Sequence, residues 1–284
     1  MTLSMNKKQL CRSEYAPLQT VIVCEPTYME ISEVINETQR HYADRNIDIE
    51  LALKQHDMFV SALEKEGIEV IKLPPQKKYP EQVFTRDIGF TLGSQIFVSQ
   101  MGHGLRQGEE NILIDWLKKE GRAYHNLKEH SIEGGDVLID GDTVFVGVSG
   151  RTCKDAIFYL QQLLPIHKVV PIPIEESYLH LDCVFNILSS EEALVYSEAI
   201  SQKEREILAS HYQLIEVEKE EQFTLGTNVL SIGNKKVLSL PVNKKVNREL
   251  RNRGYDVIEV DLSEIIKSGG SFRCCTMPIY RDSI

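Results

Sequence analysis

Apolar and polar residues alternate along four segments of the chain, each of which contains a short polar turn. The segments are residues 88–98, 137–148, 183–196 and 228–240, and their turns are Gly93-Ser94, Gly141-Asp142, Ser190-Glu191 and Gly233-Asn234. Such residues accept a positive φ or hydrogen-bond to their own backbone, as hairpin turns require. The pattern predicts four β-hairpins, and the nearly constant spacing of their turns indicates an internal repeat.

Segments with helical periodicity lie before and between these hairpins. Apolar residues at i, i+3 and i+4, such as Leu113, Trp116 and Leu117, are typical of a helix with one buried face. Helices are predicted at residues 56–66, 110–120, 154–164 and 243–253, and short strands at residues 68–73, 169–174, 214–217 and 257–262. The repeating unit is therefore ββαβ.

The number of repeats indicates a closed ring. These elements mark five helix–strand units, two of them recognised by the helix or the strand alone, but only four complete hairpins. We therefore expect residues 20–25 to pair with residues 275–280 as the fifth, which would remove the exposed sheet edges. The sequence predicts an α/β fold, a five-bladed αβ propeller with pseudo-fivefold symmetry, as a single catalytic domain over residues 1–284. Residues 27–55 fit no repeat, and we expect an insertion there, either a lid over the centre of the ring or a surface excursion.

Composition narrows the classes of function. The chain has 284 residues and a net charge of −10, which disfavours nucleic acid and suits a small cationic ligand. No run approaches the ~20 apolar residues of a membrane span, and residues 1–10 lack the apolar core of a signal peptide, so we expect a cytoplasmic protein that binds no membrane. Six scattered cysteines without CxxC spacing argue against disulfides and structural zinc. We expect no cofactor, and Gly134-Gly135 lacks the pattern of a phosphate loop. The sequence leaves open whether the protein forms a homo-oligomer.

Chemically reactive residues stand immediately before the first strand of successive hairpins. They are Asp87, Glu133, His180 with Asp182, and Cys274 before the last strand. Equivalent positions in a pseudo-symmetric ring lie at one end of its central channel, so we expect these side chains to meet there.

A planar guanidinium ion fits such a set. Carboxylates repel one another when they are brought together, and a guanidinium relieves this because it offers them paired N–H donors. Its carbon is a weak electrophile that needs a strong nucleophile, and a thiolate from Cys274 is the best available. His180 could then protonate the departing amine and deprotonate water, with Glu133 orienting its imidazole. In the empty site the carboxylates should raise the Cys274 pKa, and the arriving cation should favour the thiolate.

At these positions the chain resembles the guanidino-group-modifying enzymes of the pentein fold. The resemblance spans Val21 to Pro278 and rests on Phe84-Thr85-Arg86-Asp87, Glu133-Gly134-Gly135-Asp136, His180-Leu181-Asp182, and Gly269-Gly270 followed by Arg273-Cys274-Cys275-Thr276-Met277-Pro278. It implies that Cys274 is the nucleophile and that Cys275 points away from the site. It further implies that Asp87, Asp182 and Phe84 contact the substrate, that Arg151 binds its α-carboxylate, and that Arg106 is a second carboxylate-binding arginine.

The compact length resembles that of the dimethylarginine dimethylaminohydrolases, which yield citrulline and a methylamine. The segment at residues 84–87 is closer to the arginine deiminase pattern, so the alternatives are a deiminase or an amidinotransferase. A ribosome-binding protein of the same fold is a non-enzymatic alternative with no need for this residue set. A metal site from His180, Asp182 and Cys274 lacks the close ligand spacing of zinc sites, so no metal is expected.

Overall fold

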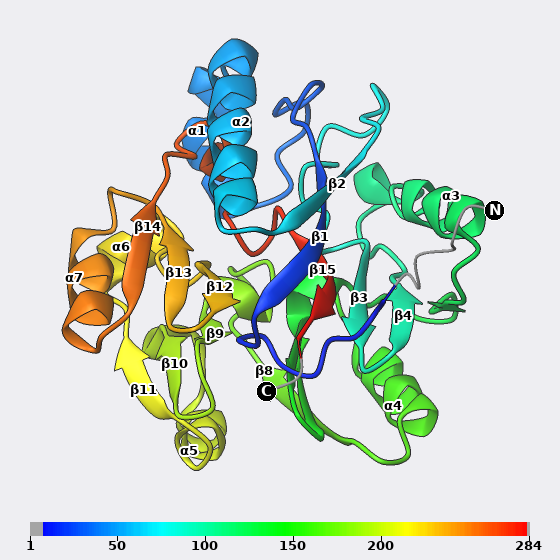
Figure 1. The fold of residues 1–284 in the computed structure, drawn as a ribbon, viewed down its shortest axis with the longest axis vertical. Coiled ribbons are helices and arrows are strands. Elements are labelled where there is room, and N and C mark those ends of the chain that lie inside the picture. The colour runs from blue at the N-terminus through cyan, green and yellow to red at the C-terminus, as the bar shows by residue number, and fades with distance from the viewer. Residues whose placement is uncertain (1–7, 283–284) are drawn as a thin grey trace.

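The computed structural model describes residues 8–282, whose strands form five three-stranded sheets arranged in a ring (Figure 1). The sheets are β15-β1-β2, β3-β4-β5, β6-β7-β8, β11-β10-β9 and β12-β13-β14. The strands are β1 (Leu18–Cys24), β2 (Glu69–Leu73), β3 (Gly89–Leu92), β4 (Gln95–Val98), β5 (His125–Asn126), β6 (Val137–Asp140), β7 (Thr143–Val148), β8 (Lys168–Pro173), β9 (Phe185–Ile187), β10 (Glu192–Val195), β11 (Gln213–Glu216), β12 (Leu230–Gly233), β13 (Lys236–Ser239), β14 (Asp256–Glu259) and β15 (Met277–Arg281). In each sheet an antiparallel pair is extended by a parallel third strand.

The two ends of the chain meet in one sheet. Strand β1 pairs antiparallel with β15, with Val21 opposite Pro278, and parallel with β2. The fifth hairpin is thus made of strands from opposite ends of the sequence, and the predicted five-bladed αβ propeller is confirmed.

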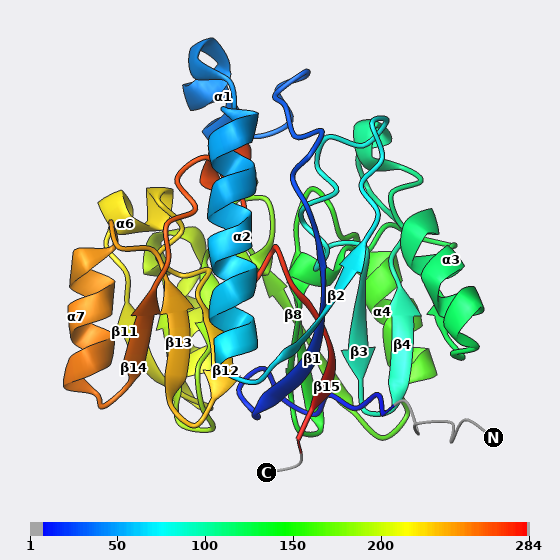
Figure 2. The same cartoon turned by 45° about the horizontal axis from the view of Figure 1, so that its top comes forward.

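Helices cover the outside of the ring (Figures 1 and 2). They are α1 (Glu37–Tyr42), α2 (Ile49–Lys65), α3 (Asn111–Glu120), α4 (Lys154–Leu163), α5 (Gln202–Ala209), α6 (Lys219–Phe223) and α7 (Lys244–Asn252). The core lies between helices and sheets: Leu113 and Leu117 of α3, for example, share one buried cluster with Ile96 and Val98 of β4. Each such buried side chain stabilises the fold by about 1.5–3 kcal/mol.

Three local predictions need correction. Helix α2 begins at Ile49, where the Asp48 side chain accepts a hydrogen bond from the backbone N–H of Leu51. The buried polar residues Gln55 and His56 interrupt its apolar stripe, so only the second half was predicted. Helix α5 and strand β5 were missed; α5 buries few apolar side chains. The last hairpin turn is shifted by one residue, to Asn234-Lys235, both with positive φ.

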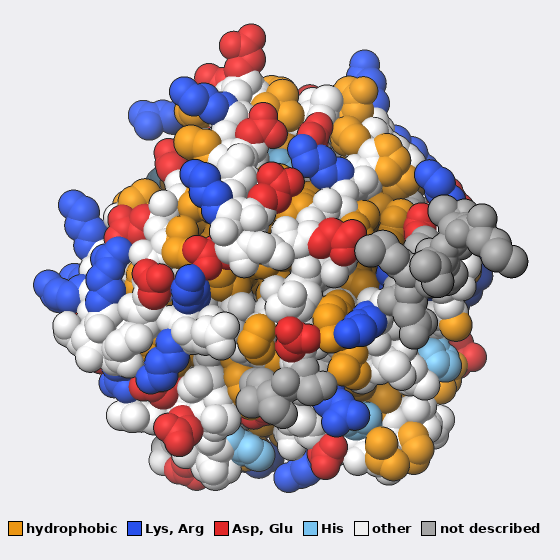
Figure 3. Space-filling view, in the orientation of Figure 1, with side chains coloured by type: hydrophobic (Ala, Val, Ile, Leu, Met, Phe, Trp, Pro, Cys, Tyr) orange, Lys and Arg blue, Asp and Glu red, His pale blue; other side chains and the backbone are white. Residues whose placement is uncertain are grey.

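The outer surface is mixed in charge. On the face shown in Figure 3, acidic and basic side chains are interspersed. Among the residues described, no helix combines the length and apolar character that a membrane span needs.

Candidate active site

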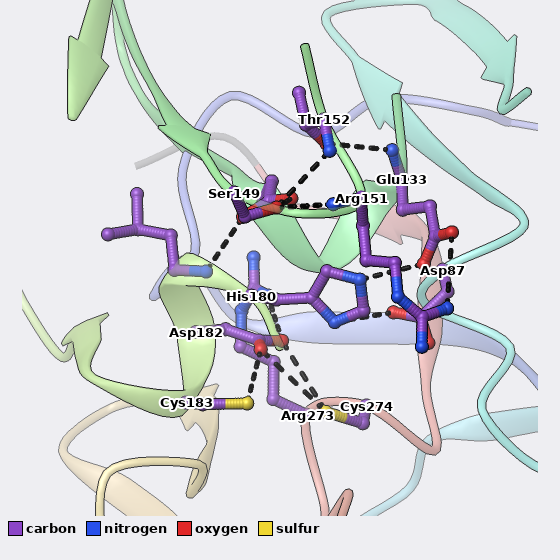
Figure 4. A network of polar contacts seen from close by, with 12 residues as sticks. Asp87, Glu133, Ser149, Arg151, Thr152, His180, Asp182, Cys183, Arg273 and Cys274 are labelled. Atoms are coloured by element: carbon purple, nitrogen blue, oxygen red, sulfur yellow. Dashed lines mark hydrogen bonds and ion pairs between the residues drawn. The ribbon is translucent and has the colours of Figure 1, made fainter. Parts of the chain in front are cut away.

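The loops that enter successive strands meet at one narrow pocket. Six of the eight predicted site residues line it: Phe84, Asp87, Arg106, Arg151, His180 and Cys274. The other two, Glu133 and Asp182, are fully buried and contact the lining residues. The structure therefore brings together all eight, although they come from four different blades of the ring. Figure 4 shows six of them: Asp87, Glu133, Arg151, His180, Asp182 and Cys274.

His180 is held between two carboxylates. It precedes the 3-10 helix η4 (Leu181–Cys183), and its Nε2 lies 2.7 Å from Glu133 Oε2, while Nδ1 lies 3.7 Å from Asp87 Oδ1. Burial alone would lower the pKa of His180, but the negative charge of Asp87 and the hydrogen bond to Glu133 outweigh it and raise the pKa to about 10. The imidazole is therefore protonated at neutral pH and able to donate a proton.

Glu133 is a fixed anion. Burial would raise its pKa, whereas the hydrogen bond and charge of His180 lower it to about 2. Its Oε1 also accepts a hydrogen bond from the backbone N–H of Gly102 at 2.9 Å, and its own N–H donates to Thr152 Oγ1 at 3.1 Å. Glu133 can therefore hold the orientation of the imidazolium.

The two glycines after Glu133 are required by packing. A Cβ atom on Gly135 would lie 2.7 Å from Asp87 Oδ1 and 2.8 Å from His180 Nδ1, and one on Gly134 would lie 2.1 Å from the Arg86 carbonyl. The absence of side chains lets the two loops approach closely enough for Asp87 and His180 to face each other. Close packing therefore explains why residues 134 and 135 are both glycines, although they lack the pattern of a phosphate loop.

Cys274 faces Asp182 and Asn228. Its Sγ lies 3.6 and 3.8 Å from the two carboxylate oxygens of Asp182, and Asn228 Nδ2 donates to the sulfur at 3.1 Å. A hydrogen bond with the Cys183 thiol, burial and the charge of Asp182 all raise the pKa of Cys274. This agrees with the expectation that Cys274 is a thiol in the empty site.

Arg273 anchors the carboxylate beside the sulfur. Its NH1 donates to Asp182 Oδ2 at 2.6 Å, and its NH2 donates to the Val137 carbonyl at 2.8 Å and meets Glu14 Oε1 at 3.2 Å. Both Arg273 and Asp182 are buried. Arg273 therefore fixes the Asp182 carboxylate in place, and both oxygens of this carboxylate can still accept a hydrogen bond from Cys274.

The two arginines of the site differ in their engagement. Arg106 donates through Nε and NH2 to Glu109 Oε2, at 3.0 and 2.8 Å, and through NH1 to Asp87 Oδ2 at 2.6 Å. Arg151 donates weakly to the Ile35 carbonyl at 3.4 Å, and its buried NH1 lies 3.7 Å from Glu133 Oε1 without a hydrogen-bond partner among the described residues. Arg151 is thus the less engaged of the two arginines; carboxylate binding by either arginine stays a prediction.

Glu81, which was not among the predicted site residues, also lines the pocket. Burial raises its pKa to about 7, against a lowering by Arg106. Its Oε1 accepts hydrogen bonds from Gln39 Nε2 at 2.8 Å and Ser268 Oγ at 2.9 Å. No predicted hairpin begins at Glu81, so the repeat did not mark it. Its position three residues before Phe84 was the one feature of the sequence that could have indicated it.

Asp87, Glu133 and His180 have ligand atoms close enough to one another for a metal ion. The Arg106 guanidinium already meets Asp87 at 2.6 Å, and His180 Nε2 is bonded to Glu133. Asp87 and Glu133 are therefore already paired with cationic side chains, with which a metal ion would have to compete.

Cys275 offers a direct test of which sulfur belongs to the site. It is fully buried in the apolar core, and it is absent from the residues lining the pocket. Replacing Cys275 with serine is expected to leave kcat/KM largely intact and to lower the free energy of unfolding by about 1–3 kcal/mol, the cost of burying a hydroxyl without a partner. Chemical denaturation and steady-state assays check this, and lost activity in a folded Cys275→Ser protein would assign the chemistry to Cys275.

Comparison with known proteins agrees with this geometry. Residues 25–281 match the family model described as N,N dimethylarginine dimethylhydrolase, eukaryotic. The chain is 54% identical over 284 residues to the uncharacterized protein YkgA of Bacillus subtilis, covering 99% of both. It is 26% identical to the N(G),N(G)-dimethylarginine dimethylaminohydrolase of Mycobacterium tuberculosis, covering 90% of this chain and 84% of the relative.

A solved structure shows the same fold. The N-terminal domain of ArgZ, a cyanobacterial arginine dihydrolase, superposes with a TM-score of 0.85 at 26% identity and covers 92% of this chain and 97% of that domain. The match to full-length ArgZ of Synechocystis spans only 37% of that protein. Taken with the propeller and the motifs in their blades, these findings establish that the chain belongs to the dimethylarginine dimethylaminohydrolase-like family of the pentein superfamily.

Proposed function

We propose that the protein hydrolyses the guanidinium group of an arginine-like amino acid through a covalent intermediate on Cys274. The observation that carries the proposal is the meeting of a thiol, a protonated imidazole and fixed carboxylates around one pocket. Asp87 supports it further, because its buried Oδ1 has no hydrogen-bond partner among the described residues. A buried carboxylate oxygen without a donor is costly, and the N–H groups of a guanidinium would satisfy it.

The side chains have complementary tasks in two steps. The Cys274 thiolate attacks the guanidinium carbon and forms a C–S bond, and His180 transfers its proton to the departing nitrogen as the C–N bond breaks. The released amine leaves a thiouronium group on Cys274. Neutral His180 then removes one proton from water and the C–O bond forms. The C–S bond breaks to release a ureido product, and the second proton of the water passes to the sulfur, which returns to the thiol.

Substrate charge supports the first step. The Cys274 pKa is raised in the free protein, so little thiolate is present before a ligand arrives. A guanidinium between Asp87 and Asp182 would offset their negative charges and lower the pKa of the sulfur. The substrate would therefore promote the ionisation of its own nucleophile.

The outer part of the pocket suits the amino-acid end of such a substrate. Arg151 and Glu81 both line it, and Arg151 also borders an open groove that continues toward solvent. The spare NH1 donor of Arg151 fits an α-carboxylate. The Glu81 carboxylate fits an α-ammonium group, which would also favour its ionised form.

The part of residues 27–55 that precedes helix α2 acts in this proposal as a lid. Asn36 donates to the Ser268 carbonyl at 3.0 Å, and Gln39 donates to Glu81 and to Ser268 Oγ. With the segment in this position the pocket has a free volume of only about 10 Å³, which holds roughly one water molecule. An amino acid can enter only if Ile35 and Asn36 move aside.

Two guanidines are the leading substrates. Dimethylarginine is favoured by the matched family model and by the Mycobacterium tuberculosis relative. Arginine is favoured by the arginine dihydrolase structure, and it carries N–H donors for Asp87 Oδ1 on every guanidinium nitrogen, whereas the dimethylated nitrogen of dimethylarginine carries none. Assays of purified protein with arginine, monomethylarginine and dimethylarginine for ureido product separate these. Amidine transfer would instead give ornithine and a new guanidino compound, and only with an added amine acceptor. No reaction with any of these substrates would contradict the proposal.

Arg151 should set selectivity for amino acids. Replacing Arg151 with alanine removes the spare guanidinium donor, and we expect KM for arginine to rise by about 10–100-fold, as loss of a hydrogen bond to a charged group predicts. Agmatine, which lacks the carboxylate, should be turned over equally by both proteins. Parallel kinetics with the two compounds measure this. An unchanged arginine-to-agmatine preference would rule out carboxylate binding by Arg151.

A further inference from the structure

One blade of the ring, the one with the β12–β13 hairpin, supplied no predicted site residue. Asn228 stands there at the position that the reactive residues occupy in the other four blades. Asp87, Glu133, Asp182, Asn228 and Cys274 follow one another at almost equal spacing. Asn228 immediately precedes the β12–β13 hairpin, and its side chain is fully buried. The pseudo-fivefold symmetry therefore brings its amide to the same end of the channel as the four reactive residues.

The amide makes three hydrogen bonds that fix its orientation. The backbone N–H of Cys274 donates to Asn228 Oδ1 at 3.2 Å, and Nδ2 donates to the Asp182 carbonyl at 3.1 Å. Because the first partner is a pure donor and the second a pure acceptor, the oxygen and nitrogen of the amide cannot be exchanged. The second N–H of Nδ2 therefore points at Cys274 Sγ, 3.1 Å away.

We propose that Asn228 is a positioning residue that clamps the backbone and the sulfur of Cys274 and stabilises the thiolate that attacks the guanidinium. This inference rests on the function proposed above. Asn228 does not line the substrate pocket, so it acts through Cys274. A neutral amide donor is suited to this place, because it supports the thiolate without presenting a second cation that would repel the substrate.

The other groups around the sulfur cannot take this role. Asp182 and Asp87 carry negative charges that oppose a thiolate, and the Cys183 thiol also raises the Cys274 pKa. His180 lies across the pocket and is engaged by Glu133. The NH1 of Arg273 already donates a hydrogen bond to Asp182. The Asn228 N–H is thus the donor that stays on the sulfur after its proton has left.

The test compares Asn228→Ala and Asn228→Asp with a structural control in the neighbouring blade. Asn186 Nδ2 donates to the carbonyls of Thr227 and Val229, so Asn186→Ala loosens the same segment without touching the sulfur. The first readout is the pH dependence of Cys274 alkylation by iodoacetamide, followed by mass spectrometry of its peptide in the free protein. The second is the pH profile of kcat.

Loss of the Asn228 donor should raise the apparent Cys274 pKa by about one unit or more, a roughly tenfold loss of thiolate at fixed pH. kcat should fall by about the same factor, with KM nearly unchanged, and the fall should be largest in Asn228→Asp. Asn186→Ala should keep the wild-type alkylation profile. An alkylation profile in folded Asn228→Ala that matches wild type or Asn186→Ala would overturn the inference. Turnover by Cys274→Ser would overturn the proposed function instead, because alkylation requires no turnover.

Discussion

Replacing Cys274 with serine is expected to lower kcat by about four orders of magnitude or more, because the variant lacks the thiol that attacks the guanidinium carbon. A serine hydroxyl has a much higher pKa than a thiol, and the neighbouring Asp182, 3.6 Å from the sulfur, would disfavour its ionisation further. The substrate should still bind, since Asp87, Arg151 and Glu81 are unchanged. Ureido-product assays and isothermal titration calorimetry measure the two effects.

Cys275→Ser is the matched control for this experiment, since it makes the same chemical change one residue along the chain. The account requires an inactive, ligand-binding Cys274 variant beside an active Cys275 variant. Substantial turnover by Cys274→Ser would show that the sulfur is not the attacking group.

Replacing His180 with glutamine is the second large change, with kcat expected to fall by about 10²–10⁴-fold as the proton donor is lost. The neighbouring Glu133→Gln keeps a hydrogen-bond acceptor but removes the negative charge that helps to raise the His180 pKa to about 10. That variant should keep more activity than His180→Gln.

The sign of the pH effect follows from the two ionisations. The kcat/KM profile reports the free protein, in which both Cys274 and His180 have raised pKa values. It should therefore rise only in the alkaline range, because the thiol ionises above its ordinary pKa, and fall near pH 10 as His180 loses its proton. The kcat profile should begin to rise at lower pH, because the bound cation favours the thiolate, and in Glu133→Gln the alkaline limb should move to lower pH. Coincident acidic limbs for kcat and kcat/KM would count against activation by the substrate.

The ring itself could be predicted because its signal is local and repeated. Hairpin turns such as Gly93-Ser94 and Gly141-Asp142 recur at regular spacing, and both glycines adopt the positive φ that these turns need. Regular spacing then orders the blades, and ring closure pairs the strands at the two ends. The site followed from the same periodicity, since Asp87, Glu133, His180 and Cys274 each stand at the head of a strand.

The contacts between blades could not be predicted. Glu81 lies outside the repeat, and its interaction with Gln39 joins it to a segment that also fits no repeat. The engagement of Arg106 with Asp87 and Glu109 depends on side-chain placement that no periodicity encodes. Asn228 does stand in phase with the reactive residues, but a neutral amide gives no chemical signal until the sulfur is seen beside it.

The most direct test of the account is to trap the covalent intermediate. Protein quenched with acid during turnover of arginine or a methylarginine is digested, and the peptides are analysed by mass spectrometry. The account predicts that the peptide containing Cys274 gains the mass of the amidino-linked substrate, and that the adduct is absent in Cys274→Ser. Turnover with an adduct on another residue, or with none in a rapid-quench series that resolves the first turnover, would contradict it.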